Sequence, residues 1–512
     1  MPNHGKPMKT TFLLFCLFPG LLWAGEFRPL FDGKTLAGWS APDMRYWTVE
    51  DGAITATSSE EVPCRKNQFL VWQLGELDDF ELKLNFRIQG QAKANSGIQI
   101  RSIVQEDGHA TGYQADMDRA GRWLGALYDE HTGRKLLAGR GQKTTIDTAG
   151  KRQTDQVANP ADLQAKVDLE GWNAYHISAR GSHITLKING HTTAEVIDDQ
   201  DGERDLQGKL ALQIHSGPPM KVQFKDIQLK RTRLDGRKKI VLVAGAPSHR
   251  SGDHEHNAGV KLLTRRLQDH DAVIATNYHD KGWPKDPTAF DNADGIVLYS
   301  DGGGSHPFIP HIDTIDALMK QGVGLMCMHY AVEVPAGRPG EHWKKWIGGH
   351  YESGWSINPH WLLRETTLAK GQPMTAGIKP WQATDEWYYN MRFRKDEGRV
   401  IRILQARPDD EARSGTTSWP RGPKEHIVKA SGRMETIMWA VEREDGGRGV
   451  GFTGGHFHRN WAEDQQRNLV LNTMLWMAGA PVPGDGFKSA AVDEEEINRD
   501  LDPKKKMQRI SL

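Results

Sequence analysis

The chain contains little cysteine, few long apolar runs and no excess of charge of either sign. Only three cysteines, Cys16, Cys64 and Cys327, occur among 512 residues, which excludes a disulfide-dense scaffold. Lys and Arg together number 66, as do Asp and Glu, so the formal net charge is zero. A balanced charge provides no electrostatic footprint for nucleic acid or for an anionic membrane surface, and we expect neither partner.

Residues 1–24 have the layout of a secretory signal peptide. Lys6 and Lys9 precede the apolar run TFLLFCLFPGLLWA, which gives way to polar sequence at Gly25. The run is short and contains a proline, so it is poorly suited to span a bilayer. We therefore expect cleavage after Ala24, a periplasmic or secreted mature protein, and no stable membrane insertion.

Two hydrophobic patterns divide the rest of the chain into two domains. Up to about Leu234, apolar and polar residues alternate, as in DFELKLNFRI from Asp79, which predicts strands with one core face and one polar face. Later apolar runs are continuous, as in KIVLVAGA and DGIVLYS, with helical stripes between them. This second pattern is typical of buried parallel strands in βαβ units. We therefore expect an all-β sandwich at 26–233, an α/β domain at 238–482 and a C-terminal tail at 483–512.

Local sequence features also predict turns, loops, a linker and the state of the cysteines. Asn189-Gly190, between two strand patterns, predicts a tight hairpin turn. The polar stretch 131–171 is expected to form loops on the rim of the sandwich. We expect a short charged linker in RTRLDGRKK from Arg231, and a solvated tail in the mixed-sign run near the C-terminus. Cys64 and Cys327 fall in different domains, so both are expected to be free buried thiols.

The polar faces of the first-domain strands carry side chains suited to a neutral, hydroxyl-rich ligand. These side chains are Gln99, Arg101, Gln114, Asp116, Gln213 and His215. Strand parity places them on one side, where they would line a single sugar-sized pocket. A solvated face of an antiparallel sheet has the same pattern, and alternation alone slightly favours that simpler interpretation.

Six segments of the first domain match, in the same order along the chain, segments of a known protein family. They are LFDGKTLAGW, NSGIQIRS, GYQADMD, LGALYDE, WNAYHISARGSHITLKING and LALQIHSGPPMKVQFKDIQLK. In these segments, residues 26–233 resemble the 3-keto-disaccharide hydrolase domain family. The resemblance implies a concanavalin A-like (lectin/glucanase) sandwich, cleavage of glycosides oxidised at C3, and a place for Tyr128 in the pocket. Many members have a glutamate and a glutamine where this chain has Gln114 and Asp116, so Asp116 or His215 would be the base here.

Histidines gather where the predicted parallel strands of the second domain end. His254 and His256 follow the first strand, His329 follows the fourth, and His456 follows a later one. The carboxyl ends of strands collect ligands in open α/β sheets, and imidazole commonly binds divalent metals. Any one of the 21 histidines is nevertheless more often an ordinary surface or core side chain. A metal site and a general acid/base site both remain open.

Five segments of the second domain also match a known pattern: HEHN, GVGLMCMHYAVE, WKKWIGGHY, TDEWYYN and GRGVGFTGGHFHRNW. They resemble the trehalose-utilisation (ThuA-like) family, which implies a flavodoxin-like α/β domain of the class I glutamine amidotransferase type. The resemblance adds Asp385 and Glu386 as carboxylates for the same cleft. In amidotransferases a cysteine occupies the tight turn after the strand equivalent to GVGLMCMH. Here His329 is expected at that turn and Cys327 within the strand, so glutamine hydrolysis is not expected.

Together the resemblances imply action on 3-keto-glycosides or 3-keto-disaccharides, by hydrolysis or by elimination and hydration at C1–C2. Asp116 or His215 would be the base and Arg101 the clamp for the enolate, with His329 catalytic in the second domain. Substrate hydrogen bonds would come from Gln99, Gln114, Tyr128 and Gln213. A divalent metal ion of unspecified identity is open for either domain, and no nucleotide cofactor is expected. In the second domain its ligands would be His254, His256, His329, His456, Asp385 and Glu386.

The expected partner is an oxidised oligosaccharide or glycoside, supplied by an upstream sugar 3-dehydrogenase. A non-catalytic sandwich that binds the sugar and delivers it to an enzymatic second domain is the alternative. The sequence leaves open the glycoside, its linkage, the choice between hydrolase and lyase, and the oligomeric state.

Overall fold

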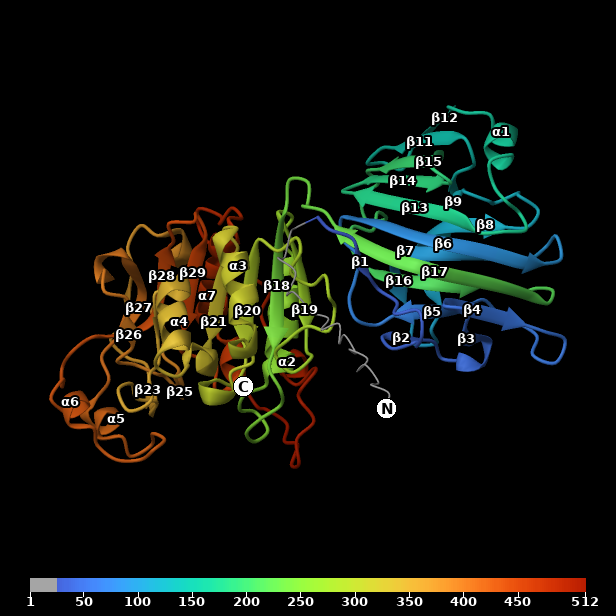
Figure 1. The fold of residues 1–512 in the computed structure, drawn as a ribbon. Helices are drawn as coiled ribbons and strands as arrows, with labels where there is room; N and C mark the ends of the chain where they lie inside the picture. Colours follow the sequence, from blue (N-terminus) through green and yellow to red (C-terminus); the bar gives the residue numbers. More distant parts are fainter. Residues whose placement is uncertain (1–24) are drawn as a thin grey trace, which may run out of the picture.

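The computed structural model describes residues 25–512. Figure 1 shows two domains, and the chain passes from the first to the second between the long strand β17 (Met220–Arg231) and β18 (Lys238–Ala244). The expected signal peptide, residues 1–24, lies outside the described residues. The predicted fold class is confirmed: a β-sandwich is followed by an α/β domain built on one mixed sheet. Within residues 25–512, no helix is long and apolar enough to cross a membrane.

Two sheets face each other in the first domain. The strands of one sheet are β1 (Arg28–Pro29), β3 (Trp47–Glu50), β4 (Ala53–Ser58), β6 (Phe80–Gly90), β11 (Gln142–Ile146), β12 (Arg152–Gln156), β13 (Asn173–Arg180), β14 (His183–Ile188), β15 (His191–Asp198) and β17 (Met220–Arg231). Those of the other are β2 (Trp39–Ser40), β5 (Gln68–Trp72), β7 (Asn95–Val104), β8 (Ala110–Asp118), β9 (Leu127–Glu130), β10 (Lys135–Ala138) and β16 (Lys209–Ile214). The spatial orders are β12-β11-β15-β14-β13-β6-β17-β4-β3, with β1 on β17, and β10-β9-β8-β7-β16-β5-β2.

Local sequence accounts for much of this sandwich. Along β6, burial alternates as the apolar pattern predicts, with Leu82 and Leu84 in the core between the sheets. The predicted hairpin between β14 and β15 is confirmed, since Asn189 and Gly190 have φ angles of +50° and +83°. A two-residue hairpin turn of this type requires positive φ at both central positions.

The expectation of rim loops at 131–171 is wrong. This stretch contains β10, β11, β12 and the short helix α1 (Pro160–Gln164). β11 pairs with β12 on one side and runs parallel to β15 on the other. All five residues of β12 are exposed, so this edge strand has no apolar face for the sequence to reveal. Backbone pairing with β11 and hydrogen bonds from Arg152 to the carbonyl oxygens of Arg134 and Leu136 hold it in place.

The second domain is built on an eight-stranded sheet. Its strands are β18 (Lys238–Ala244), β19 (Val273–Tyr278), β20 (Gly295–Tyr299), β21 (Gly324–Met328), β24 (Thr367–Leu368), β27 (Val400–Ala406), β28 (Glu435–Glu442) and β29 (Arg448–Phe452). The order is β19-β18-β20-β21-β29-β28-β27-β24, parallel from β19 to β29 and antiparallel beyond. Two small ribbons pair β22 (Gly349–His350) with β26 (Arg392–Phe393), and β23 (His360–Leu362) with β25 (Thr384–Glu386).

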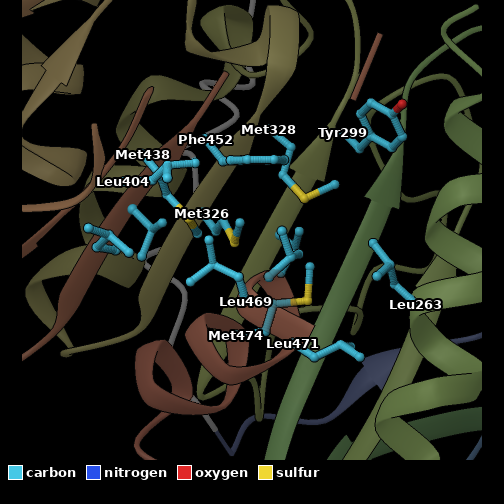
Figure 2. Packing of buried hydrophobic residues seen from close by; sticks show 14 of the residues in the cluster. Leu263, Tyr299, Met326, Met328, Leu404, Met438, Phe452, Leu469, Leu471 and Met474 are labelled. Atoms are coloured by element: carbon cyan, nitrogen blue, oxygen red, sulfur yellow. The ribbon is translucent and has the colours of Figure 1, made fainter. Parts of the chain in front are cut away.

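Helices α2 (His256–Gln268) and α7 (Asp464–Ala478) cover one face of this sheet, and α3 (Ile312–Lys320) and α4 (Arg338–Ile347) cover the other. The short helices α5 (Asp410–Ser414) and α6 (Glu425–Val428) lie to one side of the sheet (Figure 1), and α8 (Glu494–Ile497) packs near α2. Leu242 of β18 belongs to a core with α2 and α7, part of which Figure 2 shows, whereas Val243 belongs to a core with α3 and α4. Successive strand residues thus enter opposite cores, which explains the continuous apolar runs.

The short charged segment expected between the domains connects β17 to β18, and its two ends enter a buried network of charges. Arg231 is about 1% exposed and contacts Asp286 at 2.9 Å and Asp78 at 3.3 Å. Lys239, also buried, contacts Asp78. Burial acts to raise the pKa of Asp78, but the charges of Lys239 and Arg231 outweigh it and lower this pKa to about 2. The first and last charges of the segment therefore hold the two domains together.

The C-terminal segment is packed against the second domain, so the expectation of a solvated tail is also wrong. Asp500 forms ion pairs with Lys261 and Arg265 of α2, at 3.0 and 2.9 Å. Lys504 contacts Glu255, just before α2, at 3.1 Å, and their side chains are 6% and 0% exposed. The segment thus binds the helix that begins beside the histidine cluster described below.

Candidate functional site

A cavity of about 590 Å³ opens on the sandwich domain. Gln114 and Asp116 of β8, Tyr128 of β9 and His215, which follows β16, line it together. Trp123 also lines the wall, with its ring in edge contact with that of Tyr128 at 5.9 Å. The cavity therefore collects four of the side chains that strand parity and the resemblance selected. The walls combine an aromatic surface with hydrogen-bonding groups, as a sugar site requires.

Asp116 is a buried residue in the wall of this cavity. Gln114 Nε2 donates to Asp116 Oδ1 at 2.7 Å, and Gln99 Nε2 donates to Gln114 Oε1 at 2.9 Å. Burial raises the pKa of Asp116 well above its ordinary value, against the opposing effect of the Gln114 hydrogen bond. A carboxylate with a raised pKa is a stronger base once it is ionised, which suits proton abstraction from carbon.

The backbone fixes one of the two ring nitrogens of His215, Nδ1. Its Nδ1 lies 2.6 Å from the carbonyl oxygen of Ser216, which can only accept, so Nδ1 carries the proton and donates. The Nε2 atom of the neutral ring then has a free lone pair. Asp116 and His215 both remain suitable bases at this site.

Arg101 does not line the cavity, so the strand-parity prediction for it is wrong. The register of β7 against β8 shifts between Gln99 and Ile103, and Arg101 has a φ of +49°. This irregularity turns the side chain away from the cavity. It lies 2.8 Å from Asp79 and donates to the carbonyl oxygen of Asp78 at 2.7 Å, with 1% of the side chain exposed. Arg101 therefore forms a buried ion pair with Asp79 that supports the fold, and it does not act as a substrate clamp.

Two of the predicted substrate contacts also lie behind the cavity wall. Gln99 is fully buried between Gln114 and Ser102, whose hydroxyl donates to Gln99 Oε1 at 2.6 Å. Gln213 is fully buried, and within the described residues neither polar atom of its side chain has a hydrogen-bond partner. Gln99 orients Gln114. Neither Gln99 nor Gln213 lines the cavity, so neither contacts a ligand there directly.

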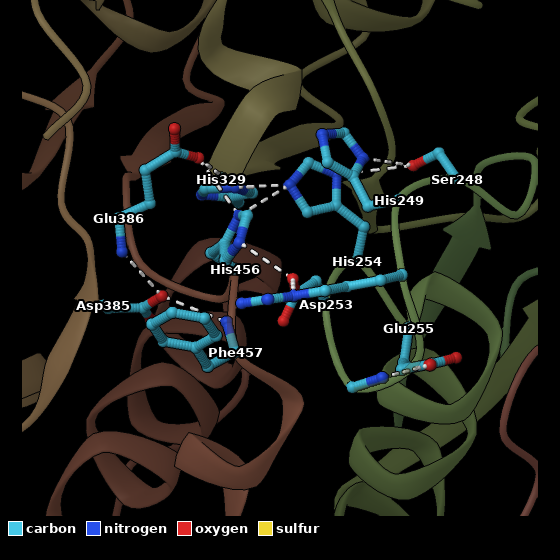
Figure 3. Close-up of polar contacts among 12 residues, drawn as sticks. Ser248, His249, Asp253, His254, Glu255, His329, Asp385, Glu386, His456 and Phe457 are labelled. Atoms are coloured by element: carbon cyan, nitrogen blue, oxygen red, sulfur yellow. Dashed lines mark hydrogen bonds and ion pairs between the residues drawn. The ribbon is translucent and has the colours of Figure 1, made fainter. Parts of the chain in front are cut away.

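A second site lies at the carboxyl ends of the strands in the α/β domain. His254, His329, His456 and Glu386 each offer one ligand atom there, and these four atoms lie within 4.8 Å of one another (Figure 3). The distances from His254 Nε2 are 3.0 Å to His329 Nε2 and 2.9 Å to His456 Nδ1. Glu386 Oε2 lies 3.1 Å from His456 Nδ1 and 3.5 Å from His329 Nε2. All four residues are buried.

The outer hydrogen bonds of the rings leave lone pairs directed at the centre. His254 Nδ1 lies 2.7 Å from Asp301 Oδ1, and His329 Nδ1 lies 2.9 Å from the carbonyl oxygen of Thr453. Both partners are acceptors, so the Nδ1 protons lie on the outside. The two Nε2 lone pairs then face each other at 3.0 Å, beside the carboxylate of Glu386. Three imidazoles and one carboxylate in this arrangement fit a divalent metal ion.

Short turns place these side chains. His329 begins the 3-10 helix η4 (His329–Val332) directly after β21 and has a φ of +53°. His254, in the loop between β18 and α2, has a φ of +47°. Non-glycine residues in this left-handed region are strained, and such strain concentrates at functional sites. Cys327 lies inside β21 and is fully buried, and burial raises the pKa of its thiol.

The structure excludes two of the six predicted metal ligands from the cluster. His256 is the first residue of α2, with Nδ1 3.0 Å from the carbonyl oxygen of Ala246. Asp385 accepts from the backbone N–H groups of Gly455 and Phe457, at 2.8 and 3.1 Å, and so anchors the loop that carries His456. Both predictions are wrong because other partners hold these side chains: the carbonyl oxygen of Ala246 for His256 and two backbone N–H groups for Asp385.

Asp301, which follows β20, orients His254. The polar residues of the sandwich cavity that were not selected from the sequence include Asn67, His109, Glu130 and His131. They lie in loops or at the end of a strand, where periodicity gives no signal, and only convergence in space reveals them.

Residues 26–230 match a family described as the 3-keto-alpha-glucoside-1,2-lyase-like domain, and residues 241–477 match a family described as trehalose utilisation. A search of the curated proteins found no match. Two solved structures illustrate the similarity. A putative glycosyl hydrolase from Parabacteroides distasonis ATCC 8503 is 20% identical, with 40% of this chain and 94% of that chain covered and a TM-score of 0.27. A putative thua-like protein from Parabacteroides merdae ATCC 43184 is 18% identical, with 50% and 96% covered and a TM-score of 0.34.

The two matched families agree with the division of the chain into a sandwich and an α/β domain. Both are families of carbohydrate-related proteins. The chain therefore combines a region similar to the 3-keto-alpha-glucoside-1,2-lyase-like domain family, residues 26–230, with a region similar to the trehalose utilisation family, residues 241–477.

Proposed function

We propose that the sandwich domain cleaves glycosides whose sugar is oxidised to a ketone at C3. One observation carries the proposal: the buried carboxylate of Asp116 lies in one cavity with His215, Tyr128 and Trp123. This arrangement combines a base in a dry environment with hydrogen-bond donors and an aromatic wall. The family of residues 26–230 supports the same substrate class.

The ketone makes the proton on C2 acidic, and the proposed mechanism uses that acidity. Asp116 or His215 removes the C2 proton, and the electron pair forms the C2–C3 double bond of an enolate, with the charge on the C3 oxygen. When the ketone re-forms, the electrons shift into a C1–C2 double bond, the C1–O bond breaks and the departing alkoxide takes up a proton. Addition of water, with hydrogen to C2 and hydroxyl to C1, then completes a net hydrolysis.

Two side chains on the cavity wall are suited to hold the substrate during this reaction. The Tyr128 hydroxyl is a donor for a sugar or enolate oxygen, and the Gln114 side chain lies between Gln99 and Asp116. Gln114 holds Asp116 by a hydrogen bond that acts to lower the Asp116 pKa, but burial outweighs this effect and the pKa stays raised.

For the second domain we propose action on the same or a related keto-sugar. His254, His329, His456 and Glu386 would hold a divalent metal ion, which would supply Lewis-acid polarisation of a keto or hydroxyl oxygen. The outward hydrogen bonds of His254 and His329 direct their Nε2 atoms toward the centre, where the lone pair of a neutral ring can bind a metal ion. The buried thiol of Cys327 takes no part.

The biological setting stays a proposal as well. An upstream sugar 3-dehydrogenase would supply the oxidised glycoside, and the protein would act in the periplasm or outside the cell after removal of residues 1–24. No nucleotide cofactor is required by this chemistry. The competing proposal is a non-catalytic sandwich that binds the sugar and delivers it to the second domain.

The test is an assay of the purified full chain on a panel of 3-keto-disaccharides, with the unoxidised parent sugars as controls. We expect release of the aglycone from the 3-keto sugars alone, because only the ketone acidifies C2. Cleavage of the parent sugars at the same rate would contradict the enolate mechanism. Binding of 3-keto sugars without turnover, unchanged by Asp116→Asn and His215→Ala, would favour the delivery role.

A further inference from the structure

A second group of metal-ligand side chains lies within the cavity of the sandwich domain. His109, Glu130 and His131 each offer one ligand atom, and these three atoms lie within 4.8 Å of one another. All three residues line the cavity that also contains Asp116 and His215. The group belongs to a different domain from the His254 cluster and shares no residue with it.

Backbone geometry brings Glu130 and His131 to the same side. Neighbouring residues of a strand normally point to opposite faces. His131 directly follows the last residue of β9 and has a φ of +55°, so the chain turns there and the two side chains converge. His131 Nε2 lies 2.8 Å from Glu130 Oε1, and their side chains are 48% and 12% exposed. The pair thus faces the mouth of the cavity.

His109 arrives from the turn before β8. Its backbone N–H donates to Asp107 Oδ1 at 3.0 Å, and its ring packs edge-on against Phe69 and His131, with centroid distances of 5.3 and 3.8 Å. Its Nε2 atom is buried and has no hydrogen-bond partner within residues 25–512. A buried imidazole nitrogen without a partner is costly unless a proton donor or a cation satisfies it.

We propose that His109, Glu130 and His131 bind a divalent transition-metal ion in the sandwich cavity. Two imidazoles and one carboxylate suit ions such as Zn²⁺, Mn²⁺ or Fe²⁺, and leave further coordination positions open. Metal–ligand bonds of about 2.0–2.2 Å place the ligand atoms of one ion up to about 4 Å apart, so only a small closure of the group is required. Asn67 Nδ2, which donates to Glu130 Oε1 at 3.1 Å, holds the carboxylate in place.

The open positions of this ion face the proposed substrate. Adjacent oxygens, such as a C3 ketone and a neighbouring hydroxyl, are a suitable bidentate ligand for an ion with two free positions. This use of the ion rests on the proposed function, whereas binding of the ion does not. The ion would take the role of substrate clamp that was expected of Arg101, which does not line the cavity.

The test counts bound Zn²⁺ in the full chain after equilibration with the metal alone and removal of unbound ion. A His329→Ala/His456→Ala background removes the cluster of the second domain. In that background we expect about one Zn²⁺ per chain, falling at least tenfold when His109→Ala/His131→Ala is added. Glu130→Gln, which keeps the shape of the side chain, should weaken binding at least tenfold. His191→Ala, an exposed histidine of the same domain, is the matched control and should change nothing.

The outcomes separate this inference from the proposed function. Zn²⁺ content that is unchanged in both the His109→Ala/His131→Ala and Glu130→Gln variants overturns the site. Loss of Zn²⁺ in these variants, with circular dichroism unchanged, supports it even if the wild-type chain cleaves no 3-keto-disaccharide. Conversely, cleavage by the wild-type chain with no Zn²⁺ bound in the background variant supports the proposed function and overturns the metal site.

Discussion

The Nε2 atoms of His254 and His329 lie 3.0 Å apart, and each ring uses its Nδ1 atom to donate outward, to Asp301 and to the carbonyl oxygen of Thr453. Two nitrogen lone pairs therefore face each other in a buried site. A shared cation relieves this repulsion, and Glu386 supplies a balancing charge from 3.5 Å. The arrangement differs from the thiol at the corresponding turn of amidotransferases, because Cys327 lies inside β21.

The first prediction contrasts His329 with Cys327. His329→Ala removes a central ligand and should lower divalent-metal content at the second-domain cluster at least tenfold. Cys327→Ser should leave it unchanged, because the side chain points into the core of the sheet. Metal analysis of both full-length variants, with circular dichroism to check folding, provides the measurement. Metal loss in Cys327→Ser but not in His329→Ala would show that the thiol is the functional group.

The second prediction concerns Asp116. If this carboxylate removes the C2 proton, Asp116→Asn should lower kcat on a 3-keto-disaccharide by about 10²–10⁴-fold. Because burial raises the pKa of Asp116, wild-type kcat/KM should rise with pH as the carboxyl ionises. The exposed Asp155→Asn of β12 is the matched control. Retained activity in Asp116→Asn together with its loss in His215→Ala would assign the base to His215.

The third prediction tests the corrected role of Arg101. Arg101→Ala leaves Asp79 as a buried charge without its closest partner, so the free energy of unfolding should fall by about 3–5 kcal/mol. Arg65→Ala, at an exposed position, should change it little. Denaturant unfolding of the full chain, followed for the sandwich domain, gives both values. Unchanged stability with a large rise in KM would instead restore Arg101 as a substrate clamp.

The fourth prediction is a pH dependence of stability. Burial and the nearby charge of Asp129 raise the pKa of Asp205 to about 6, above its value of about 3.9 in an unfolded chain. The folded state then binds the proton more tightly, so stability falls as pH rises from about 4 to about 6. Asp205→Asn should raise Tm at pH 8 and have little effect at pH 4. The exposed Asp201→Asn is the control, and an equal gain in Tm at both pH values would contradict this explanation.

The fifth prediction concerns the packed C-terminal segment. Lys504→Ala leaves the fully buried Glu255 without its cation, although Gly252 and Asp502 still donate to it through their backbone N–H groups. We expect a lower Tm and partial recovery in the Glu255→Gln/Lys504→Ala double variant, because the uncompensated charge is then absent. Thermal unfolding measures both effects, with the exposed Lys506→Ala as control. A Tm equal to that of the wild type would mean that the segment is not held by this ion pair.

The periodic parts of both sites were predictable. Gln114 and Asp116 share a face of β8 because side chains alternate along a strand, and their common cavity agrees with that rule. His254, His329 and His456 follow strand ends that parallel pairing brings to one edge of the sheet. Arg101 departs from the rule because one irregularity in β7 reverses parity.

The sequence by itself determined the division into an alternating all-β part and a βαβ part, the hairpin at Asn189-Gly190 and the burial of Cys327, because each depends on local periodicity or turn chemistry. Tertiary structure alone decided which charged residues are buried partners, as with Arg101 and Asp79 or Lys504 and Glu255. It also decided the grouping of His109 with Glu130 and His131, which depends on a turn before β8 meeting the end of β9. Such contacts join positions with no periodic relationship, so their chemistry arises only when the chain closes on itself.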